Sequence, residues 1–188
     1  MEKTLYTLII FSENLAGLLN QVTTVFTRRQ INIESLNVSA SGVENVHRYT
    51  ITCYCDEDTI QKVTKQIEKK IDVIQASYFT NQEIFIMESA LFKISTAKLT
   101  ADRSISKAIR LHDGKIVEVN STYSIVSQEG LPEEVSELYR KLRESGGLLQ
   151  FVRSGAIAVT KSHREELHDY LALRRTEYEW HNLHVEEK

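Results

Sequence analysis

The chain has 188 residues, enough for one large domain or two small ones. Hydrophobic residues make up 41% and charged residues 26%, close to the globular average, which excludes collagen, coiled-coil and disordered chains. With 23 basic and 26 acidic residues the net charge is −3, so the composition gives no electrostatic basis for binding nucleic acid. One proline and seven glycines also exclude flexible linkers and proline-rich recognition segments.

Two features bear on the cellular compartment. The apolar run at residues 5–11 is too short to span a bilayer, and it lacks the basic flank and the cleavage site of a signal peptide. The two cysteines, Cys53 and Cys55, are two apart on a predicted strand, so they share a face and cannot easily form a disulfide. We therefore expect reduced thiols, no membrane contact and a cytoplasmic location.

The first 80 residues predict one small α+β unit. Apolar side chains at helical spacing predict a helix that ends near Arg29, and its stripe comprises Leu18, Leu19, Val22, Val25 and Phe26. A second helix opens with the acidic residues 56–58, and its buried side comprises Ile60, Val63 and Ile67. Residues rich in β-branched and aromatic side chains predict strands at 5–11, 31–38, 49–55 and 72–78. The order β-α-β-β-α-β is that of a ferredoxin-like unit.

The same order is repeated in the second half of the chain. A helix marked by Ile105, Ala108 and Ile109 is expected to stop at Gly114, in the C-terminal glycine position. A second helix begins at Pro132, and its apolar stripe comprises Val135, Leu138, Tyr139 and Leu142. The predicted strands lie at 90–94, 115–119, 123–126 and 148–152.

The composition changes at Lys161, where a capping box and an apolar stripe predict a charged helix that runs to about Trp180. We therefore expect an α+β fold of two tandem ferredoxin-like units, at residues 1–80 and 81–160, followed by a helical tail at residues 161–188.

The sequence offers few catalytic patterns. It contains no Gly-x-Ser-x-Gly elbow, Gly-rich phosphate loop or His-Glu-x-x-His motif. An acylphosphatase-like enzyme would need an arginine-bearing loop after the first strand, and the loop at residues 12–17 has no arginine. An RNA-recognition module would display its aromatic residues together, whereas Tyr49 and Tyr54 fall on opposite faces of one strand. The residues alone therefore single out no catalytic site.

The tail contains four of the six histidines, which raises the question of a metal site. His181 and His184 are three residues apart, but no cysteine and no suitably spaced third ligand accompanies them. We therefore expect no metal site there. The four histidines are His163, His168, His181 and His184.

The most informative segment lies between the first strand and the first helix, at residues 13–19. Gly17 would let a ligand approach the backbone, and free N–H groups at a helix start can bind a carboxylate. The Asn14 amide could contact the ammonium or the carboxylate of such a ligand. A structural role is the alternative, in which Asn14 is the helix N-cap and Gly17 lies in the first turn, and the residues alone favour this role.

A resemblance to a known family rests on two motifs. They are Glu13-Asn14-x-x-Gly17-x-Leu19 and Arg29-x-x-Asn32-Ile33-Glu34-Ser35-Leu36. Both resemble the ACT domain of the small, regulatory subunit of acetolactate synthase (acetohydroxyacid synthase). Residues 114–119 and 153–155 are similar to the C-terminal domain of the same family, so the likeness extends over about residues 3–160 and does not include the tail. The resemblance implies an N-terminal ACT domain and a C-terminal ACT-like regulatory domain.

The resemblance also implies a function. The chain would be non-catalytic, would bind the large, thiamine-diphosphate-dependent catalytic subunit, would raise its activity, and would confer feedback inhibition by valine or another branched-chain amino acid. Thiamine diphosphate, Mg²⁺ and FAD would belong to the catalytic subunit, so this chain would carry no cofactor. ACT domains pair edge to edge, so the resemblance implies a homodimer with the effector at its interface. The implied effector contacts are Asn14, Leu15, Ala16 and Gly17 from one chain, and Asn32 and Ile33 from the other.

One position departs from the family pattern. The family tends to carry glycine between the arginine and the Asn-Ile pair, where this chain has Gln30. If this position has a positive φ, a residue other than glycine costs up to about 1 kcal/mol, and the edge of the pocket would change. Without the resemblance, Ile33 would be a core strand residue, and Asn32 would make a hydrogen bond in a turn or at a strand edge.

Two other functions stay open at this point. One is an ACT-type amino-acid sensor that regulates another enzyme or transcription. The other is a stand-alone enzyme on a ferredoxin-like scaffold.

Overall fold

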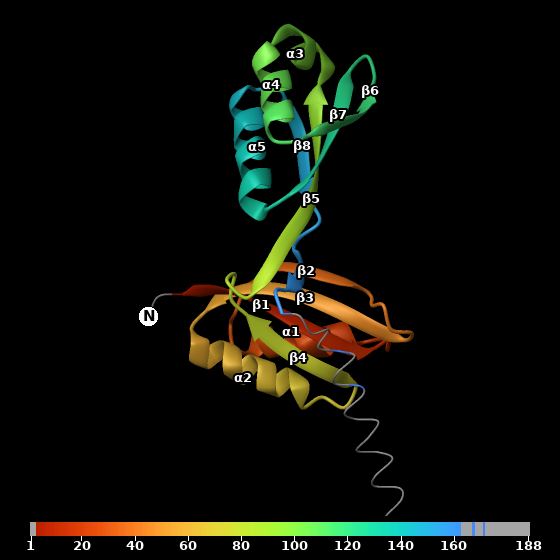
Figure 1. Ribbon diagram of the computed structural model, residues 1–188, viewed down its shortest axis with the longest axis vertical. Coiled ribbons are helices and arrows are strands. Elements are labelled where there is room, and N and C mark those ends of the chain that lie inside the picture. Colours follow the sequence, from red (N-terminus) through yellow and green to blue (C-terminus); the bar gives the residue numbers. More distant parts are fainter. Residues whose placement is uncertain (1–2, 163–166, 168–170, 172–188) are drawn as a thin grey trace, which may run out of the picture.

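The computed structural model describes residues 3–162, together with Leu167 and Leu171. The described residues form two antiparallel sheets, and helices cover one face of each (Figure 1). In the N-terminal unit the strands lie in the order β2-β3-β1-β4. Its elements are β1 (Thr4–Glu13), α1 (Leu18–Arg28), β2 (Ile33–Ala40), β3 (Val46–Cys55), α2 (Glu57–Glu68) and β4 (Val73–Phe79).

The second unit repeats this arrangement. Its strands lie in the order β6-β7-β5-β8, and the short strand β9 pairs separately with β5. Its elements are β5 (Ile84–Ser95), α3 (Thr96–Ala101), α4 (Arg103–Leu111), β6 (Lys115–Val119), β7 (Tyr123–Gly130), α5 (Pro132–Glu144), β8 (Leu148–Arg153) and β9 (Ile157–Thr160). Two β-α-β-β-α-β units on two antiparallel sheets confirm the predicted α+β, ferredoxin-like fold class.

Each unit has a hydrophobic core between its sheet and its helices. In the N-terminal unit Phe26 of α1 packs with Leu8, Ile10 and Ile51 of the sheet. In the C-terminal unit Phe92 of β5 packs with residues of α4 and α5, and its ring lies 5.0 Å from that of Phe151. Such burial of large apolar side chains is the main favourable term for each unit.

The predicted stripe of α1 is confirmed except at one position. Leu18, Val22, Val25 and Phe26 are buried, but Leu19 is 41% exposed. Neighbouring residues on a helix point about 100° apart, and in the first turn Leu18 faces the core while Leu19 points away from it.

The turn after α1 shows which backbone conformation Gln30 adopts. Gln30 has a φ of 55°, and its N–H donates to the Thr27 carbonyl at 3.0 Å. The next N–H, of Ile31, donates to the Phe26 carbonyl at 3.1 Å, which completes a Schellman motif. The left-handed position is therefore kept without glycine, at a cost of up to about 1 kcal/mol.

The end of α4 differs from the prediction in one residue. The left-handed position is occupied by Asp113, with a φ of 55°, and Gly114 follows it. Gly114 is required for another reason, because a Cβ atom there would lie 2.9 Å from Ile109 Cγ2 and 3.1 Å from Val126 Cγ1. The glycine allows the chain to pass close to the core rather than to adopt a positive φ.

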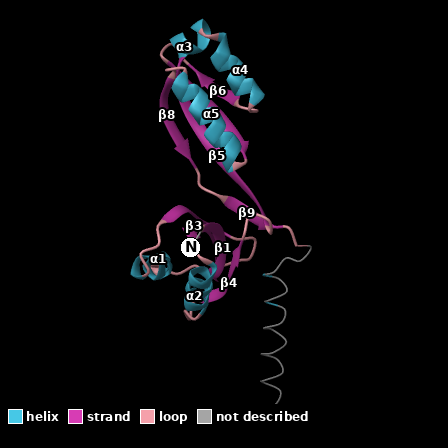
Figure 2. Ribbon diagram, turned by 90° about the vertical axis from the view of Figure 1, so that its left-hand side faces the viewer, coloured by secondary structure: helices cyan, strands magenta, loops and turns pink. Residues whose placement is uncertain are grey.

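The sequence analysis missed three elements, and two of them connect the units. Residues 84–87 of β5 pair with β9 to form a two-stranded segment, which we call the β5–β9 ribbon. The ribbon lies on the face of the N-terminal sheet that α1 and α2 leave open (Figure 2). Thr7, Ile9, Thr50 and Thr52 on that face are buried, as are Ile84, Ala156 and Ala158 above them. The third missed element is the short helix α3.

Other expectations have the following outcomes. Cys53 and Cys55 are free and buried, and Tyr49 is buried while Tyr54 is 49% exposed, as opposite faces require. None of the helices in the described ranges is long and apolar enough to cross a membrane. Apart from Leu167 and Leu171, which are helical, the predicted tail helix lies outside the described residues, as do the four tail histidines.

Candidate ligand-binding site

The loop between β1 and α1 ends in a left-handed glycine. Gly17 is the N-cap of α1, with a φ of 88° and a ψ of −10°. No atom lies within 4 Å of the place where its Cβ would be, so the backbone here is open on the outside. The loop is held to the β2–β3 connection, because the Asn14 N–H donates to the Asn45 carbonyl at 3.0 Å.

The alternative that Asn14 caps the helix is wrong. Gly17 occupies the cap position, and no side chain accepts a hydrogen bond from the first turn of α1. The Leu18 N–H donates to Leu15 at 3.4 Å and the Gln21 N–H to Gly17 at 3.1 Å. Within the described ranges, the N–H groups of Leu19 and Asn20 have no acceptor. Two adjacent free N–H groups at a helix start favour an anionic ligand.

Two leucines beside this helix start are exposed. Leu15 is 49% exposed in the loop and Leu19 is 41% exposed on the first turn of α1. This contribution was missed from the sequence, because Leu19 was predicted to lie in the buried stripe of α1. Free N–H groups next to exposed apolar side chains suit a small molecule that has both a carboxylate and an apolar group.

The other two predicted residues lie elsewhere in the chain. Strands β1 and β2 both run antiparallel to β3, so they run in the same direction. Ile33 is level with Tyr6 through their common partner Cys53, whereas Ala40 is level with Ser12 through His47. The structure therefore brings Asn14, Leu15, Ala16 and Gly17 together at one end of the sheet, and it places Asn32 and Ile33 at the opposite end.

Strand β2 forms an outer edge of its sheet. Among the described strands it pairs with β3 alone, and the register shifts between Ile33 and Ser35. Ile33 is half-buried and packs against the N-terminal core, while Asn32 just before the strand is exposed. Ile33 therefore packs in the core, as its residue type alone suggested. No described strand pairs with the outer side of β2, so its backbone groups are free there.

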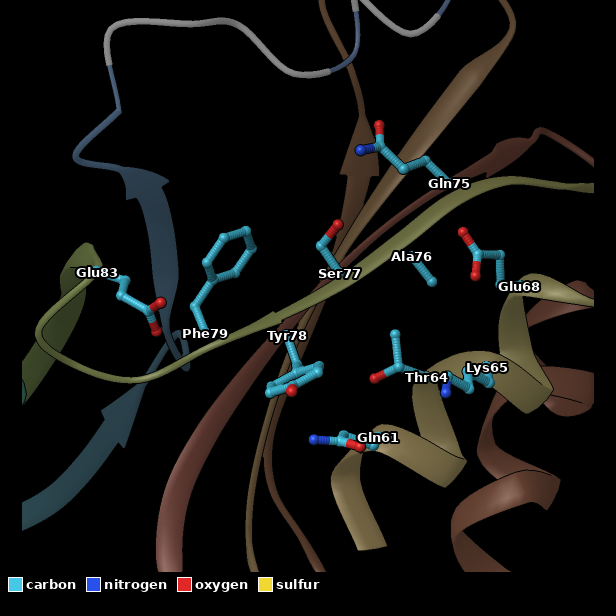
Figure 3. A pocket seen from close by; sticks show the side chains of 10 residues that line it. All are labelled: Gln61, Thr64, Lys65, Glu68, Gln75, Ala76, Ser77, Tyr78, Phe79 and Glu83. Atoms are coloured by element: carbon cyan, nitrogen blue, oxygen red, sulfur yellow. The ribbon is translucent and has the colours of Figure 1, made fainter. Parts of the chain in front are cut away.

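A separate hollow of about 680 Å³ lies between α2 and β4 (Figure 3). Its lining is mostly polar, and Thr64, Lys65 and Glu68 of α2 face Ala76 and Tyr78 of β4. Glu83 at its rim accepts hydrogen bonds from the Thr80 N–H and hydroxyl, which lower the pKa of its carboxyl. The hollow contains none of the six predicted site residues.

Both thiols of the chain are buried. Burial raises the pKa of the Cys53 thiol to about 12, so it stays protonated and unreactive at neutral pH. Within residues 3–162, no group of three or more His, Cys, Asp or Glu side chains could hold a metal ion.

Comparisons with known proteins identify the family to which the chain is similar. A family model described as the AHAS small subunit-like ACT domain matches residues 8–75, and one described as the small subunit of acetolactate synthase matches residues 87–162. The fold and these matches define a protein with an N-terminal ACT domain.

Related proteins that match most of the chain show which family of ACT-domain proteins it belongs to. The acetolactate synthase small subunit of Mycolicibacterium smegmatis is 31% identical over 159 residues, which cover 85% of this chain and 92% of the relative. That of Haemophilus influenzae is 29% identical over 160 residues, covering 85% of this chain and 98% of the relative. The chain belongs to the family of acetolactate synthase small subunits, as the two motifs indicated.

A solved structure has the same fold. The crystal structure of the acetolactate synthase small subunit from Thermotoga maritima matches with a TM-score of 0.76 and 22% sequence identity. The match covers 85% of this chain and 99% of that chain, so both units take part in it.

Proposed function

We propose that this chain is the regulatory subunit of an acetolactate synthase. It binds the catalytic subunit in the cytoplasm, raises its activity, and makes it sensitive to a branched-chain amino acid. Membership of the small-subunit family carries the proposal, and the open start of α1 supports it. In this proposal residues 1–80 bind the effector, residues 81–160 and the tail at 161–188 serve regulation, and thiamine diphosphate, Mg²⁺ and FAD are held by the catalytic subunit.

The chemistry of the α1 start suggests how an amino acid binds. Its carboxylate accepts hydrogen bonds from the N–H groups of Leu19 and Asn20, and the Asn14 amide contacts a polar end of the ligand. No atom lies within 4 Å of the Cβ position of Gly17, and Ala16 is exposed, so a ligand can reach the backbone here. An aliphatic side chain packs on Leu15 and Leu19, which favours valine, leucine or isoleucine over polar amino acids.

A homodimer explains how the two separated halves of the site meet. If the β2 edges of two copies pair antiparallel about a two-fold axis, the start of one β2 lies beside the end of the other. The end of β2 lies level with the end of β1, from which the loop to Gly17 continues. Asn32 and the backbone of Ile33 of a second copy thus approach the α1 start of the first.

Regulation follows from linkage. An effector that spans two chains favours the dimer arrangement in which both halves of its site are close together. If the active state of the catalytic subunit binds the two arrangements with different affinity, the effector shifts the population of that active state. The coupling free energy between the two binding events is reciprocal.

Reconstitution tests the proposal. Acetolactate formation from pyruvate is measured with this chain alone, with the catalytic subunit of the same organism alone, and with both, while valine, leucine and isoleucine are titrated. We expect no activity from this chain alone, activation on mixing, and inhibition by at least one of the amino acids. The loss of a hydrogen bond to a charged ligand makes Asn14→Ala about tenfold less sensitive.

The matched control is Asn81→Ala, which changes an exposed asparagine in the turn before β5. It should leave both activation and inhibition unchanged. A mixture no more active than the catalytic subunit alone, and equally insensitive to all three amino acids, would contradict the proposal.

A further inference from the structure

We propose that the β5–β9 ribbon couples the effector-binding edge of the N-terminal unit to the C-terminal unit, with Arg48 and Ser35 as the positioning residues that hold it. The regulatory meaning of this inference rests on the proposed function. The contacts that carry it do not, because they are made within one chain.

The ribbon covers the N-terminal sheet closely. Residues 84–87 of β5 and the strand β9 lie above the open face, on the side away from α1 and α2 (Figure 2). Ile84, Ala158 and Ile9 are buried there, and they belong to neither of the two hydrophobic cores. The two units thus meet in a separate packed layer.

Arg48 joins β1, β3 and the ribbon. From β3 its guanidinium donates to the Ala158 carbonyl of β9 and, at 3.2 Å, to Thr50 Oγ1. It also lies over the Phe11 ring, 5.8 Å from its centroid, and Phe11 is the β1 residue opposite Arg48, three residues before Asn14. One side chain therefore contacts both the ribbon and the strand that leads into the candidate site.

The environment of Arg48 is unusual for a cation. It is half-buried, no carboxylate lies in ion-pair range among the described residues, and burial lowers the pKa of its guanidinium. A desolvated charge without a counter-ion is costly unless its donors find good acceptors. The Ala158 carbonyl is such an acceptor, so loss of the ribbon contact would leave a guanidinium N–H group of Arg48 without its acceptor.

Ser35 makes a second connection, from β2. Its hydroxyl shares a hydrogen bond of 2.8 Å with Thr52 Oγ1 and accepts one from the Ala156 N–H at 3.4 Å. Gly155 passes so close that a Cβ there would lie 3.3 Å from Ser35 Cβ, and its φ is 78°. Ser35 lies two residues after Ile33 on β2. A shift of this edge strand therefore moves the Ser35 side chain, which residues 155 and 156 contact.

The ribbon is also tied into the C-terminal sheet. The Ser154 N–H donates to the Ser89 carbonyl at 2.8 Å, and the Ser89 N–H donates to Ser154 Oγ at 3.0 Å. Next to this pair, Arg153 Nη2 lies 2.7 Å from Glu88 Oε1, and Glu88 is buried. Because β5 continues from the ribbon into the sheet without a break, a displacement at Gly155 reaches β5 and β8 directly.

Hydrogen exchange on the full chain tests the contacts themselves. Arg48→Met keeps the length of the side chain but removes its donors, and Ser35→Ala removes the second connection. We expect the amides of residues 157–160 to exchange about tenfold faster in Arg48→Met, and to a lesser extent in Ser35→Ala, because the ribbon opens locally more often. Arg48→Lys, which keeps one charged donor, should lie between wild type and Arg48→Met.

Controls separate this effect from unfolding. Arg28→Met replaces an exposed arginine on α1, and Ser106→Ala a serine on α4, and neither should change exchange in β9. The amides of β7, in the core of the C-terminal sheet, should stay as protected as in wild type in all variants. Wild-type exchange of β9 in both Arg48→Met and Ser35→Ala would overturn the proposal.

The reconstituted enzyme tests the coupling. We expect Arg48→Met to bind the branched-chain amino acid with a Kd within about threefold of wild type in calorimetry, yet to transmit less inhibition. Unchanged inhibition overturns the coupling role, and so does a loss of binding that accounts for all the lost inhibition. If wild type binds none of the three amino acids, the proposed function fails, and hydrogen exchange still decides whether Arg48 and Ser35 hold the ribbon.

Discussion

The two units have equivalent strand orders, but they differ at the helix that follows the first strand, which is α1 in the N-terminal unit and the pair α3 and α4 in the C-terminal unit. In the C-terminal unit Ser95 accepts a hydrogen bond from the Lys98 N–H at 3.4 Å, and Asp102 accepts one from the Ser104 N–H at 2.8 Å. In the N-terminal unit Gly17 caps α1 without any side-chain acceptor. The helices that follow the first strand of the C-terminal unit are thus capped by side chains, whereas the helix that follows the first strand of the N-terminal unit has two free N–H groups at its start.

The largest expected effect tests whether the two cores are separate. Phe26→Ala and Phe92→Ala each delete a fully buried ring, and each should cost about 3–5 kcal/mol of unfolding free energy. Phe26→Ala loosens the packing of α1 on its sheet and should abolish effector binding, whereas Phe92→Ala should largely preserve effector binding. Chemical denaturation and calorimetry on the two variants measure both effects. Equal loss of binding in both would mean that the units do not fold as separate cores.

A smaller effect is expected at the end of α4. Gly114→Ala brings a Cβ within 2.9 Å of Ile109 Cγ2, so it should destabilise the chain by about 1–3 kcal/mol through overpacking. Gly42→Ala is the matched control, because nothing lies within 4 Å of its Cβ position. Urea midpoints compare the two variants. If Gly114→Ala is no less stable than Gly42→Ala, the close approach of the chain to the C-terminal core is incorrect.

The Schellman motifs of the two units predict a gain in stability. Gln30→Gly relieves a positive φ in the N-terminal unit and should stabilise it by up to about 1 kcal/mol. Asp113→Gly tests the equivalent position after α4, where the gain should be similar or smaller, since aspartate tolerates this region better than glutamine. Thermal unfolding measures both variants. Destabilisation by Gln30→Gly would show that the turn does not hold this conformation.

The smallest expected effect is on pH dependence, and its sign differs between the units. The Thr59 N–H and hydroxyl lower the pKa of the Asp56 carboxyl at the start of α2, so its stabilising contribution is present above about pH 3.9 and is lost as the pH falls through the folded value. Burial raises the pKa of Glu88, so its contribution is lost as the pH rises from about 4.3 through the folded value.

Substitution of either carboxyl group should remove its contribution to the pH dependence of stability. Asp56→Asn should flatten the acid limb of the stability curve, and Glu88→Gln should remove the decline on the neutral side of it. Urea midpoints measured from pH 3 to 7 compare the two variants with wild type. Identical curves for all three proteins would contradict both assignments.

Periodic elements were predictable because their patterns are local. Helix α5, for example, has Pro132 at its first position, and its apolar residues face the core at helical spacing. The ribbon was not predictable in this way. Its strand β9 has four residues, and the apolar run at residues 84–87 packs on a threonine-rich face that only the folded N-terminal sheet creates.

The candidate site was predictable in part. Gly17 and the free helix start agree with the ligand-binding interpretation, although residue type alone favoured Asn14 as a cap. The exposure of Leu19 could not be read from an apolar stripe that already contained Leu18. The role of Arg48 could not be predicted from a sequence motif, because its partner is a backbone carbonyl 110 residues away in the sequence.

The most direct test of the account is calorimetric titration of the full chain with valine, leucine and isoleucine. We expect saturable binding of at least one of them, a loss of about tenfold or more in affinity for Asn14→Ala, and no change for Asp102→Asn at the helix start of the other unit. No binding of any of the three by wild type, or an Asn14→Ala variant that binds as tightly as wild type, would contradict it.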